Sequence, residues 1–167
     1  MSDKIKGIAV VPGSFDPITI GHIDIAKRAA DMYEKVYLAV MINSQKKYMF
    51  GLDERKRIAE CALSGIDGVS VISSDGYLWK LCKDLSAVAI VKGVRNEKDR
   101  AYELDMAEYN ARYYPEAKTV LLECNEALAD ISSTVVRDRI NGGEDISEYL
   151  PREAIEEINK IIELRSK

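Results

Sequence analysis

The sequence predicts an α/β fold: a doubly wound, Rossmann-like, five-stranded parallel sheet with helices on both faces, followed by C-terminal helices. Short runs rich in β-branched and aliphatic residues alternate along the chain with helical patterns, so each connection between strands is a crossover and the strands run parallel. Several of these runs are apolar at consecutive positions, as expected for strands that are covered on both faces. We expect the strands at residues 7–11, 36–42, 69–72, 87–91 and 119–122.

Helical patterns fill the segments between the strands, and we expect helices at residues 23–33, 52–63, 77–84 and 99–114. After the fifth strand we expect a shorter helix at residues 132–141 and a turn at Asn141-Gly142-Gly143. A final helix should begin at Pro151, because proline suits the first helical turn. No internal repeat, low-complexity tract or Pro- and Ser-rich linker interrupts the pattern. We therefore expect one domain over residues 1–167.

Composition narrows the class of protein. A chain of 167 residues with 47% hydrophobic residues can bury one substantial core. A net charge of −4 argues against nucleic acid as a partner, because sequence-independent binding to a phosphate backbone draws on many Lys and Arg contacts. Three cysteines without C-x-x-C spacing lie in apolar segments, which suggests free thiols in a reducing cytoplasm. No charged leader or membrane-length apolar run is present, so we expect a cytoplasmic protein that is neither processed nor bound to a membrane.

The ligand site of a doubly wound sheet lies beyond the C-terminal ends of its strands, so the polar segments there are informative. The first expected strand is followed by residues 12–22, P-G-S-F-D-P-I-T-I-G-H, which hold the only histidine of the chain, His22. Gly13 allows close approach of the backbone, Ser14 offers a hydroxyl group, and Gly21-His22 open a helix whose free N–H groups attract anions. G-x-x-x-x-G-K-[ST] and G-x-G-x-x-G are both absent, so the common phosphate-loop and dinucleotide-binding motifs do not explain this segment.

Further cations and hydroxyl groups follow three other strands. Lys46 and Lys47 lie on the loop after the second strand, and residues 92–95, K-G-V-R, follow the fourth strand, with Tyr102-Glu103 on the next helix. After the fifth strand, residues 131–137, I-S-S-T-V-V-R, place three hydroxyl groups at a helix start and an arginine one turn further on. Hydroxyl groups, helix-start amides and arginine make a second anion cradle.

Taken together, these motifs resemble those of the bacterial phosphopantetheine adenylyltransferases, a family of the nucleotidyltransferase superfamily. The resemblance rests on G-S-F-D-P-x-T-x-G-H, the K-K loop, K-G-V-R, Y-E and I-S-S-T-x-x-R, which occur in order and with matching spacing over nearly the whole chain. It implies transfer of AMP from ATP to 4′-phosphopantetheine, which gives dephospho-CoA and pyrophosphate in the penultimate step of coenzyme A synthesis. It also implies Mg²⁺ as cofactor and a homohexamer.

The resemblance also implies roles for individual residues. His22 would stabilise the transition state, and His22 and Lys46 would be the catalytic residues, with no protein ligand for the metal. The phosphopantetheine contacts would be Ser14, Lys46, Leu78 and Lys92. The ATP contacts would be Ser14, Phe15, His22, Gly93, Val94, Arg95, Glu103, Leu128, Ala129, Asp130, Ile131, Ser132, Ser133 and Thr134.

The implied reaction fits these residue types. The nucleophile is an ionised phosphate oxygen, so no general base is required. The reaction needs two phosphates held in line, with positive charge or hydrogen-bond donors where charge grows on the α-phosphate and on the leaving pyrophosphate. His22, Lys46 and the Ser132/Ser133 cradle offer them.

The chain departs from the family pattern at two places. Lys92 stands where the family usually has arginine, which keeps the charge but loses the bidentate fork. Residues 128–130, L-A-D, stand where the family tends to carry aromatic residues.

Other interpretations remain open on the sequence alone. His22 taken by itself is typical of a helix cap. Lys92 and Arg95 could flank a surface turn. Ser132–Thr134 could be only an N-cap cluster, although a capped helix end is also an anion site.

Two other functions are also possible. A sister enzyme, either a nicotinamide-nucleotide adenylyltransferase or a cytidylyltransferase for a small phosphorylated alcohol, would generally carry histidine at the position of Thr19. A noncatalytic nucleotide-binding module is disfavoured because His22, Lys46 and I-S-S-T-x-x-R are all present.

Overall fold

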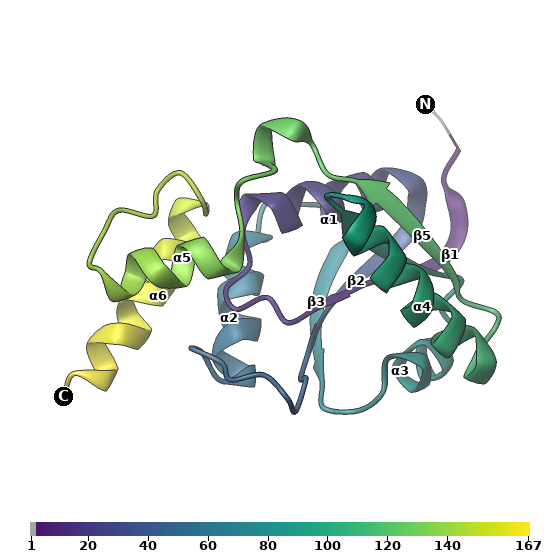
Figure 1. Cartoon of the computed structure of the whole chain (residues 1–167), viewed down its shortest axis with the longest axis horizontal. Coiled ribbons are helices and arrows are strands. Elements are labelled where there is room, and N and C mark those ends of the chain that lie inside the picture. The colour runs from purple at the N-terminus through teal and green to yellow at the C-terminus, as the bar shows by residue number, and fades with distance from the viewer. Residues whose placement is uncertain (1–2) are drawn as a thin grey trace.

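The computed structural model describes residues 3–167 and contains a five-stranded parallel sheet in the order β3-β2-β1-β4-β5 (Figure 1). The strands are β1 (Ile5–Gly13), β2 (Tyr33–Met41), β3 (Val69–Ser74), β4 (Ala89–Val94) and β5 (Lys118–Glu123). The strand order confirms the predicted doubly wound fold. The direction of winding reverses between β1 and β4, and such a switch point is where ligands bind in these sheets.

Four helices cover the two faces of the sheet. α1 (Ile20–Met32) and α2 (Leu52–Ala62) lie on one face, and α3 (Leu78–Leu85) and α4 (Glu97–Tyr113) lie on the other. A short 3₁₀ turn, η1 (Glu126–Leu128), leads from β5 towards α5 (Ser133–Asn141) and α6 (Arg152–Arg165). α5 and α6 lie at one end of the molecule, where α6 packs beside α2 (Figure 1).

The apolar core is divided by the sheet. Val11 and Leu38 belong to the cluster under α1 and α2, whereas Val10 and Ile90 pack on the opposite face with Cys82 of α3. Because successive residues of a strand point to opposite faces, strands that are covered on both sides read as continuous apolar runs. This explains why the sheet could be predicted from the sequence.

Several element boundaries differ from the prediction. The helix expected at residues 23–33 begins at Ile20, because Thr19 caps it, and its expected last residue, Tyr33, begins β2 instead. The strand expected at residues 87–91 runs from Ala89 to Val94, so most of the K-G-V-R motif belongs to β4 and does not form a surface turn. Position 93 in this strand favours glycine, because the Cβ atom of any other residue would lie only 3.0 Å from the Ile25 side chain.

Candidate functional site

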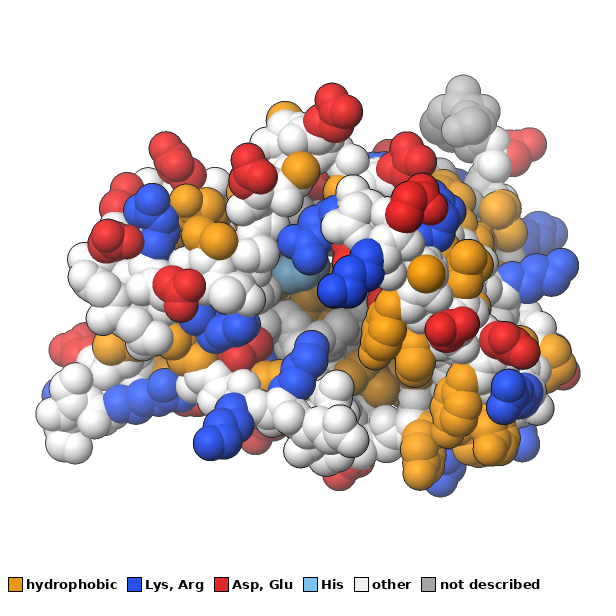
Figure 2. All heavy atoms as spheres, in the orientation of Figure 1, with side chains coloured by type: hydrophobic (Ala, Val, Ile, Leu, Met, Phe, Trp, Pro, Cys, Tyr) orange, Lys and Arg blue, Asp and Glu red, His pale blue; other side chains and the backbone are white. Residues whose placement is uncertain are grey.

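A cavity of about 650 Å³ opens at the C-terminal ends of β1 and β4. Its walls come from the segment after β1, the start of α1, the loop before α2, the start of α4 and the start of α5. Figure 2 shows this hollow, with the pale-blue histidine inside it and lysine and arginine side chains around its mouth. The volume is in the range of small-molecule sites, and the location is the one predicted from the strand order.

The structure brings most of the predicted site residues into this one cavity. Those lining it are Ser14, Phe15, His22, Lys46, Lys92, Gly93, Arg95, Glu103, Leu128, Ile131, Ser132, Ser133 and Thr134. Lys47, which the sequence also offered, lies beside Lys46 and is exposed. The segments that contribute these side chains are distant in sequence but adjacent at one sheet edge.

Four predicted contacts lie outside the cavity lining: Leu78, Val94, Ala129 and Asp130. Leu78 is the first residue of α3 and packs against the core beneath that helix. Val94 is buried, whereas Ala129 and Asp130 are exposed near the cavity. A role for these four residues in binding stays a prediction.

His22 takes part in a helix cap and also lines the cavity. Its Nδ1 atom accepts a hydrogen bond from the backbone N–H of Thr19 at 3.0 Å, and the Thr19 side chain accepts from the His22 backbone N–H, so the two residues form a capping box. Burial, and next the positive charge of Arg95, lower the pKa of His22 from 6.5 to about 4. The imidazole is therefore neutral at pH 7, and because Nδ1 is an acceptor, the ring proton resides on Nε2.

Phe15 shapes the wall beside His22. Its ring meets the His22 ring edge to face, with centroids 5.0 Å apart, and it is almost fully buried. Its backbone has a φ angle of +49°, which is uncommon for a bulky residue and typical of functional segments. A Cβ atom on Gly13 would lie 2.9 Å from the Phe15 ring, so only glycine leaves the ring in this position.

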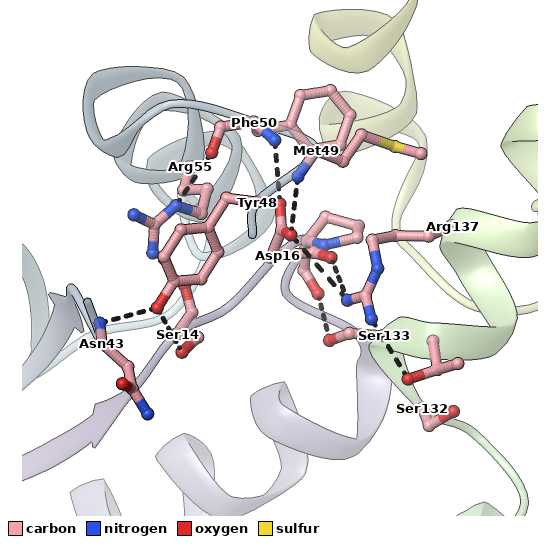
Figure 3. Close-up of polar contacts among 12 residues, drawn as sticks. Ser14, Asp16, Asn43, Tyr48, Met49, Phe50, Arg55, Ser132, Ser133 and Arg137 are labelled. Carbon is pink, nitrogen blue, oxygen red and sulfur yellow. Dashed lines mark hydrogen bonds and ion pairs between the residues drawn. The ribbon is translucent and has the colours of Figure 1, made fainter. Parts of the chain in front are cut away.

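Asp16 joins three parts of the site and was not singled out from the sequence. Its carboxylate accepts hydrogen bonds from the backbone N–H groups of Met49 at 2.9 Å and Phe50 at 3.0 Å, and it is almost fully buried. Arg137 of α5 donates to the Asp16 carbonyl oxygen at 2.9 Å (Figure 3). Arg137, which the sequence placed in the second anion cradle, thus ties α5 to the segment after β1. An aspartate before proline in a loop gave no signal of these distant partners.

The start of α5 provides amide groups at the cavity. Ser132 is the N-cap, and its Oγ atom accepts a hydrogen bond from Val135 N–H at 3.2 Å. Ser133 Oγ donates to the Pro17 carbonyl oxygen at 2.8 Å, which joins this helix to the segment after β1. The amides of Ser133 and Thr134, being in the first helical turn, have no intrahelical acceptor and are suited to an anion. The helix cap at Ser132 is confirmed, and an anion site at the same helix start stays a prediction.

Cations and carboxylates pair along the β4 and α4 side of the cavity. Lys92 Nζ lies 2.7 Å from Glu103 Oε2, and both side chains are largely buried. Arg95 pairs with Asp99 at 3.3 Å. The Lys92–Glu103 pair was not predicted, because the two residues were assigned to different substrates. It means that Lys92 does not face the cavity as an isolated cation.

The four acids that line the cavity are engaged already: Asp16 with amides, Asp24 with Arg28, Asp99 with Arg95, and Glu103 with Lys92. Among residues 3–167 no group of three or more His, Cys, Asp and Glu side chains is arranged to hold a metal ion. The side chains in this part of the chain do not form a metal cage. None of the helices in the described part of the chain has the length and apolar character needed to cross a bilayer.

Comparison with known proteins agrees with this geometry. The model of the cytidylyltransferase-like family matches residues 10–139. A phosphopantetheine adenylyltransferase of Lactobacillus acidophilus is 40% identical over 154 residues, covering 92% of this chain and 96% of the relative. The enzyme of the same name from Heliobacterium modesticaldum is 44% identical over 144 residues, covering 86% of each chain.

Solved structures share the fold at low sequence identity. The Plasmodium falciparum nicotinic acid mononucleotide adenylyltransferase, complexed with NaAD, aligns with a TM-score of 0.65 at 14% identity, covering 94% of this chain and 96% of that one. This likeness concerns the fold alone. The relatives, which match along nearly their whole length at about 40% identity, decide the family. The chain belongs to the cytidylyltransferase-like family and, within it, to the phosphopantetheine adenylyltransferases.

Proposed function

We propose that the protein transfers AMP from ATP to 4′-phosphopantetheine and releases pyrophosphate, which gives dephospho-CoA and serves coenzyme A biosynthesis. Relatives that carry this enzyme's name match most of the chain. The observation that carries the proposal is the cavity at the switch point, which combines a neutral histidine, a helix start with free amides, and four cations from two segments, Lys46, Lys47, Lys92 and Arg95. Such a cavity suits two phosphate-bearing substrates.

In the proposed reaction a phosphate oxygen of phosphopantetheine attacks the α-phosphorus of ATP, and the bond to the pyrophosphate oxygen breaks. The attacking oxygen is ionised already, so no residue has to remove a proton from it. His22 donates its Nε2–H to an α-phosphate oxygen, a bond that strengthens as negative charge develops. Because the imidazole is neutral with a fixed tautomer, this donor is in place before the reaction begins.

The cations would hold the two substrates in line. Lys46 belongs to the exposed loop after β2 and would bridge the transferred phosphate, whereas Ser14 and Lys92 would contact phosphopantetheine, with Leu78 further along that substrate. The segment 128–134, with residues 93–95, Phe15 and Glu103, would enclose ATP. Positioning of this kind is the main means by which an enzyme speeds phosphoryl or nucleotidyl transfer without proton abstraction.

Mg²⁺ is part of the proposal as a companion of the nucleotide. The cavity acids are each engaged by an amide or a cation, and Mg²⁺ commonly binds through substrate phosphates with few protein ligands. We therefore assign it no protein ligand and no separate step. ATP binding measured by calorimetry with and without Mg²⁺ tests this assignment.

A homohexamer and a cytoplasmic location also remain proposals. An exposed aromatic face on α3 and α4 supports assembly: Tyr77, Trp79 and Tyr113 stack in series, with centroid distances of 6.1 Å and 4.9 Å. Apolar side chains gather over these helices at the lower right of Figure 2, and patches of this kind mark interaction surfaces. Light scattering of the purified protein tests the hexamer.

The cysteines bear on the proposed cytoplasmic location. All three lie within the described residues and form no disulfide, in keeping with a reducing compartment.

A substrate panel tests the function. Purified protein is incubated with ATP or CTP and with phosphopantetheine, nicotinamide mononucleotide or glycerol 3-phosphate, and pyrophosphate release is measured. We expect release with ATP and phosphopantetheine alone. Turnover of nicotinamide mononucleotide without turnover of phosphopantetheine would overturn the proposal in favour of a sister enzyme. Tight ATP binding without turnover of any pair would identify a noncatalytic module.

A further inference from the structure

A buried arginine joins the segments that form one side of the cavity. Arg55 lies on α2, and only 1% of it is exposed. Its Nη1 atom donates to the carbonyl oxygens of Ser14 at 2.7 Å and Met41 at 2.8 Å, and its Nε atom donates to the carbonyl of Phe50 at 3.1 Å. These three carbonyls belong to the ends of β1 and β2 and to the segment that enters α2. The guanidinium group therefore fixes both phosphate-facing loops relative to each other.

Tyr48 is seated on this arginine. The guanidinium carbon of Arg55 lies 3.9 Å from the centre of the Tyr48 ring, a cation–π contact within a partly buried environment. Tyr48 also lines the cavity, two residues after Lys46. The contact orients the phenol ring, because the face of the ring meets a guanidinium group that is itself held by three hydrogen bonds.

The Tyr48 hydroxyl group connects the two loops. Its Oη atom accepts a hydrogen bond from the backbone N–H of Asn43 at 2.8 Å and lies 3.1 Å from Ser14 Oγ (Figure 3). An amide can only donate, so Tyr48 Oη is the acceptor in the first bond and keeps its own proton for another partner. Either hydroxyl group can donate in the Tyr48–Ser14 bond, and the direction in which Tyr48 donates to Ser14 Oγ leaves the Ser14 hydroxyl proton free to turn towards a ligand.

We propose that Tyr48 is a positioning residue: it orients the Ser14 hydroxyl group as a hydrogen-bond donor to the phosphate of phosphopantetheine. The proposal rests on the proposed function, because it concerns the same cavity. The series runs from the Asn43 amide through Tyr48 and Ser14 to the substrate phosphate, and each member donates in the same direction. Such aligned series strengthen the last donor.

A purely structural role for Tyr48 makes a different prediction. If the tyrosine serves only to cover Arg55, its ring is sufficient and the hydroxyl group contributes nothing to binding. Tyr48→Phe separates the two, because it keeps the ring on the guanidinium group and removes only the oxygen. Tyr149→Phe is a matched control: Tyr149 also lies over an arginine, Arg139, at 5.3 Å, and it is outside the cavity lining.

The test is a double-mutant cycle on pyrophosphate release. Tyr48→Phe should raise the KM for phosphopantetheine roughly three- to tenfold, the equivalent of one neutral hydrogen bond, with kcat nearly unchanged. Ser14→Ala should raise KM as well. In the Ser14→Ala background, Tyr48→Phe should have almost no further effect, because the donor it orients is gone. Tyr149→Phe should match the wild type, and the melting temperatures of all folded variants are measured alongside.

Two results would overturn the proposal. One is a Tyr48→Phe variant with the wild-type KM; the other is an effect of Tyr48→Phe that is equally large with and without Ser14, which would place its action elsewhere. A wild-type protein that releases no pyrophosphate from ATP and phosphopantetheine would overturn the proposed function itself, and this inference with it. The wild-type measurement therefore distinguishes failure of the function from failure of the inference.

Discussion

The Nδ1 atom of His22 lies 3.0 Å from the backbone nitrogen of Thr19. The single histidine of the chain, which was expected to be a catalytic residue, therefore also caps the N-terminus of its own helix. The two interpretations that the sequence left open, a helix cap and a catalytic donor, involve different atoms of one ring. Capping occupies Nδ1 and leaves the proton on Nε2. The cap therefore decides the tautomer that the proposed reaction needs.

The first prediction separates these two uses of His22. His22→Ala should lower kcat by roughly 10²- to 10³-fold, the cost of losing one donor to developing charge. It should also lower stability by about 1 kcal/mol, because the cap is lost. His22→Gln should recover much of the stability, since glutamine at this helix position also accepts from the N-cap amide, but it should not recover kcat.

Steady-state kinetics and melting temperatures on the same samples provide the comparison. The ATP affinity should change far less than kcat, because a transition-state contact acts mainly on kcat. A His22→Ala protein that melts at a lower temperature but turns over at the wild-type rate would show that His22 serves only as a helix cap.

The second prediction concerns the ionisation of His22. Because the chain has one histidine, its ring nitrogens are the only imidazole signals in a ¹H–¹⁵N correlation spectrum of the protein. We expect the Nε2–H tautomer at pH 7 and a pKa of about 4, set by burial and by Arg95. A mid-point near 6.5, or a proton on Nδ1, would contradict the geometry. His22→Gln identifies the signals by their disappearance.

The third prediction follows from the same pKa. The folded-state pKa of His22 is lower than its unfolded value, so between pH 6.5 and about 4 the unfolded state binds more protons. The contribution is fully present above pH 6.5 and is lost as pH falls towards 4, by at most about 3.5 kcal/mol of unfolding free energy. Urea unfolding at pH 7.5 and pH 5 measures it. In His22→Gln the decrease between these two pH values should be smaller than in the wild type; an equal decrease would assign it to other groups.

The fourth prediction tests Lys92. Lys92→Arg should remain active, because arginine keeps the charge and can grip a phosphate through two bonds. Lys92→Ala should have a much lower kcat/KM for phosphopantetheine. It should also be less stable, because Glu103 loses its partner at 2.7 Å.

Removing both charges resolves the ambiguity in Lys92→Ala. The double variant Lys92→Ala/Glu103→Gln should regain stability without regaining kcat/KM for phosphopantetheine. Kinetics and thermal melting of the three variants check this. Unchanged kinetics in Lys92→Ala would make the lysine only a partner of Glu103.

The fifth prediction concerns Asp16. In Asp16→Asn one of the two side-chain atoms that accept from Met49 and Phe50 becomes an NH₂ group that faces an N–H donor. We expect a loss of about 1–3 kcal/mol of unfolding free energy, the usual cost of a buried amide without an acceptor. Asp31→Asn is the control, since Asp31 is exposed. Equal urea midpoints for the two variants would contradict the role assigned to Asp16.

Much of the fold was readable because its causes are local. Continuous apolar runs predicted the central strands, and alternation with helices predicted a parallel sheet. The hydroxyl cluster at Ser132 predicted a helix start, because an N-cap bonds to residues within one turn. Boundaries failed where a contact from another segment extends an element: Lys92 and Val94 continue β4 through pairing with β5 residues Leu121 and Glu123.

The site divides in the same way. Strand ends gather at one edge of a parallel sheet whatever the details, so the sequence alone determined that the polar segments around His22, Lys46, Lys92 and Ser132 meet. Only the tertiary structure decided what holds them. Arg55 reads as one more charge on a polar helix, and nothing in its neighbours indicates that it is buried under Tyr48 against Ser14. Its partners lie up to 41 residues away, and the free energy of burying a charge depends on those distant carbonyls, which no local pattern encodes.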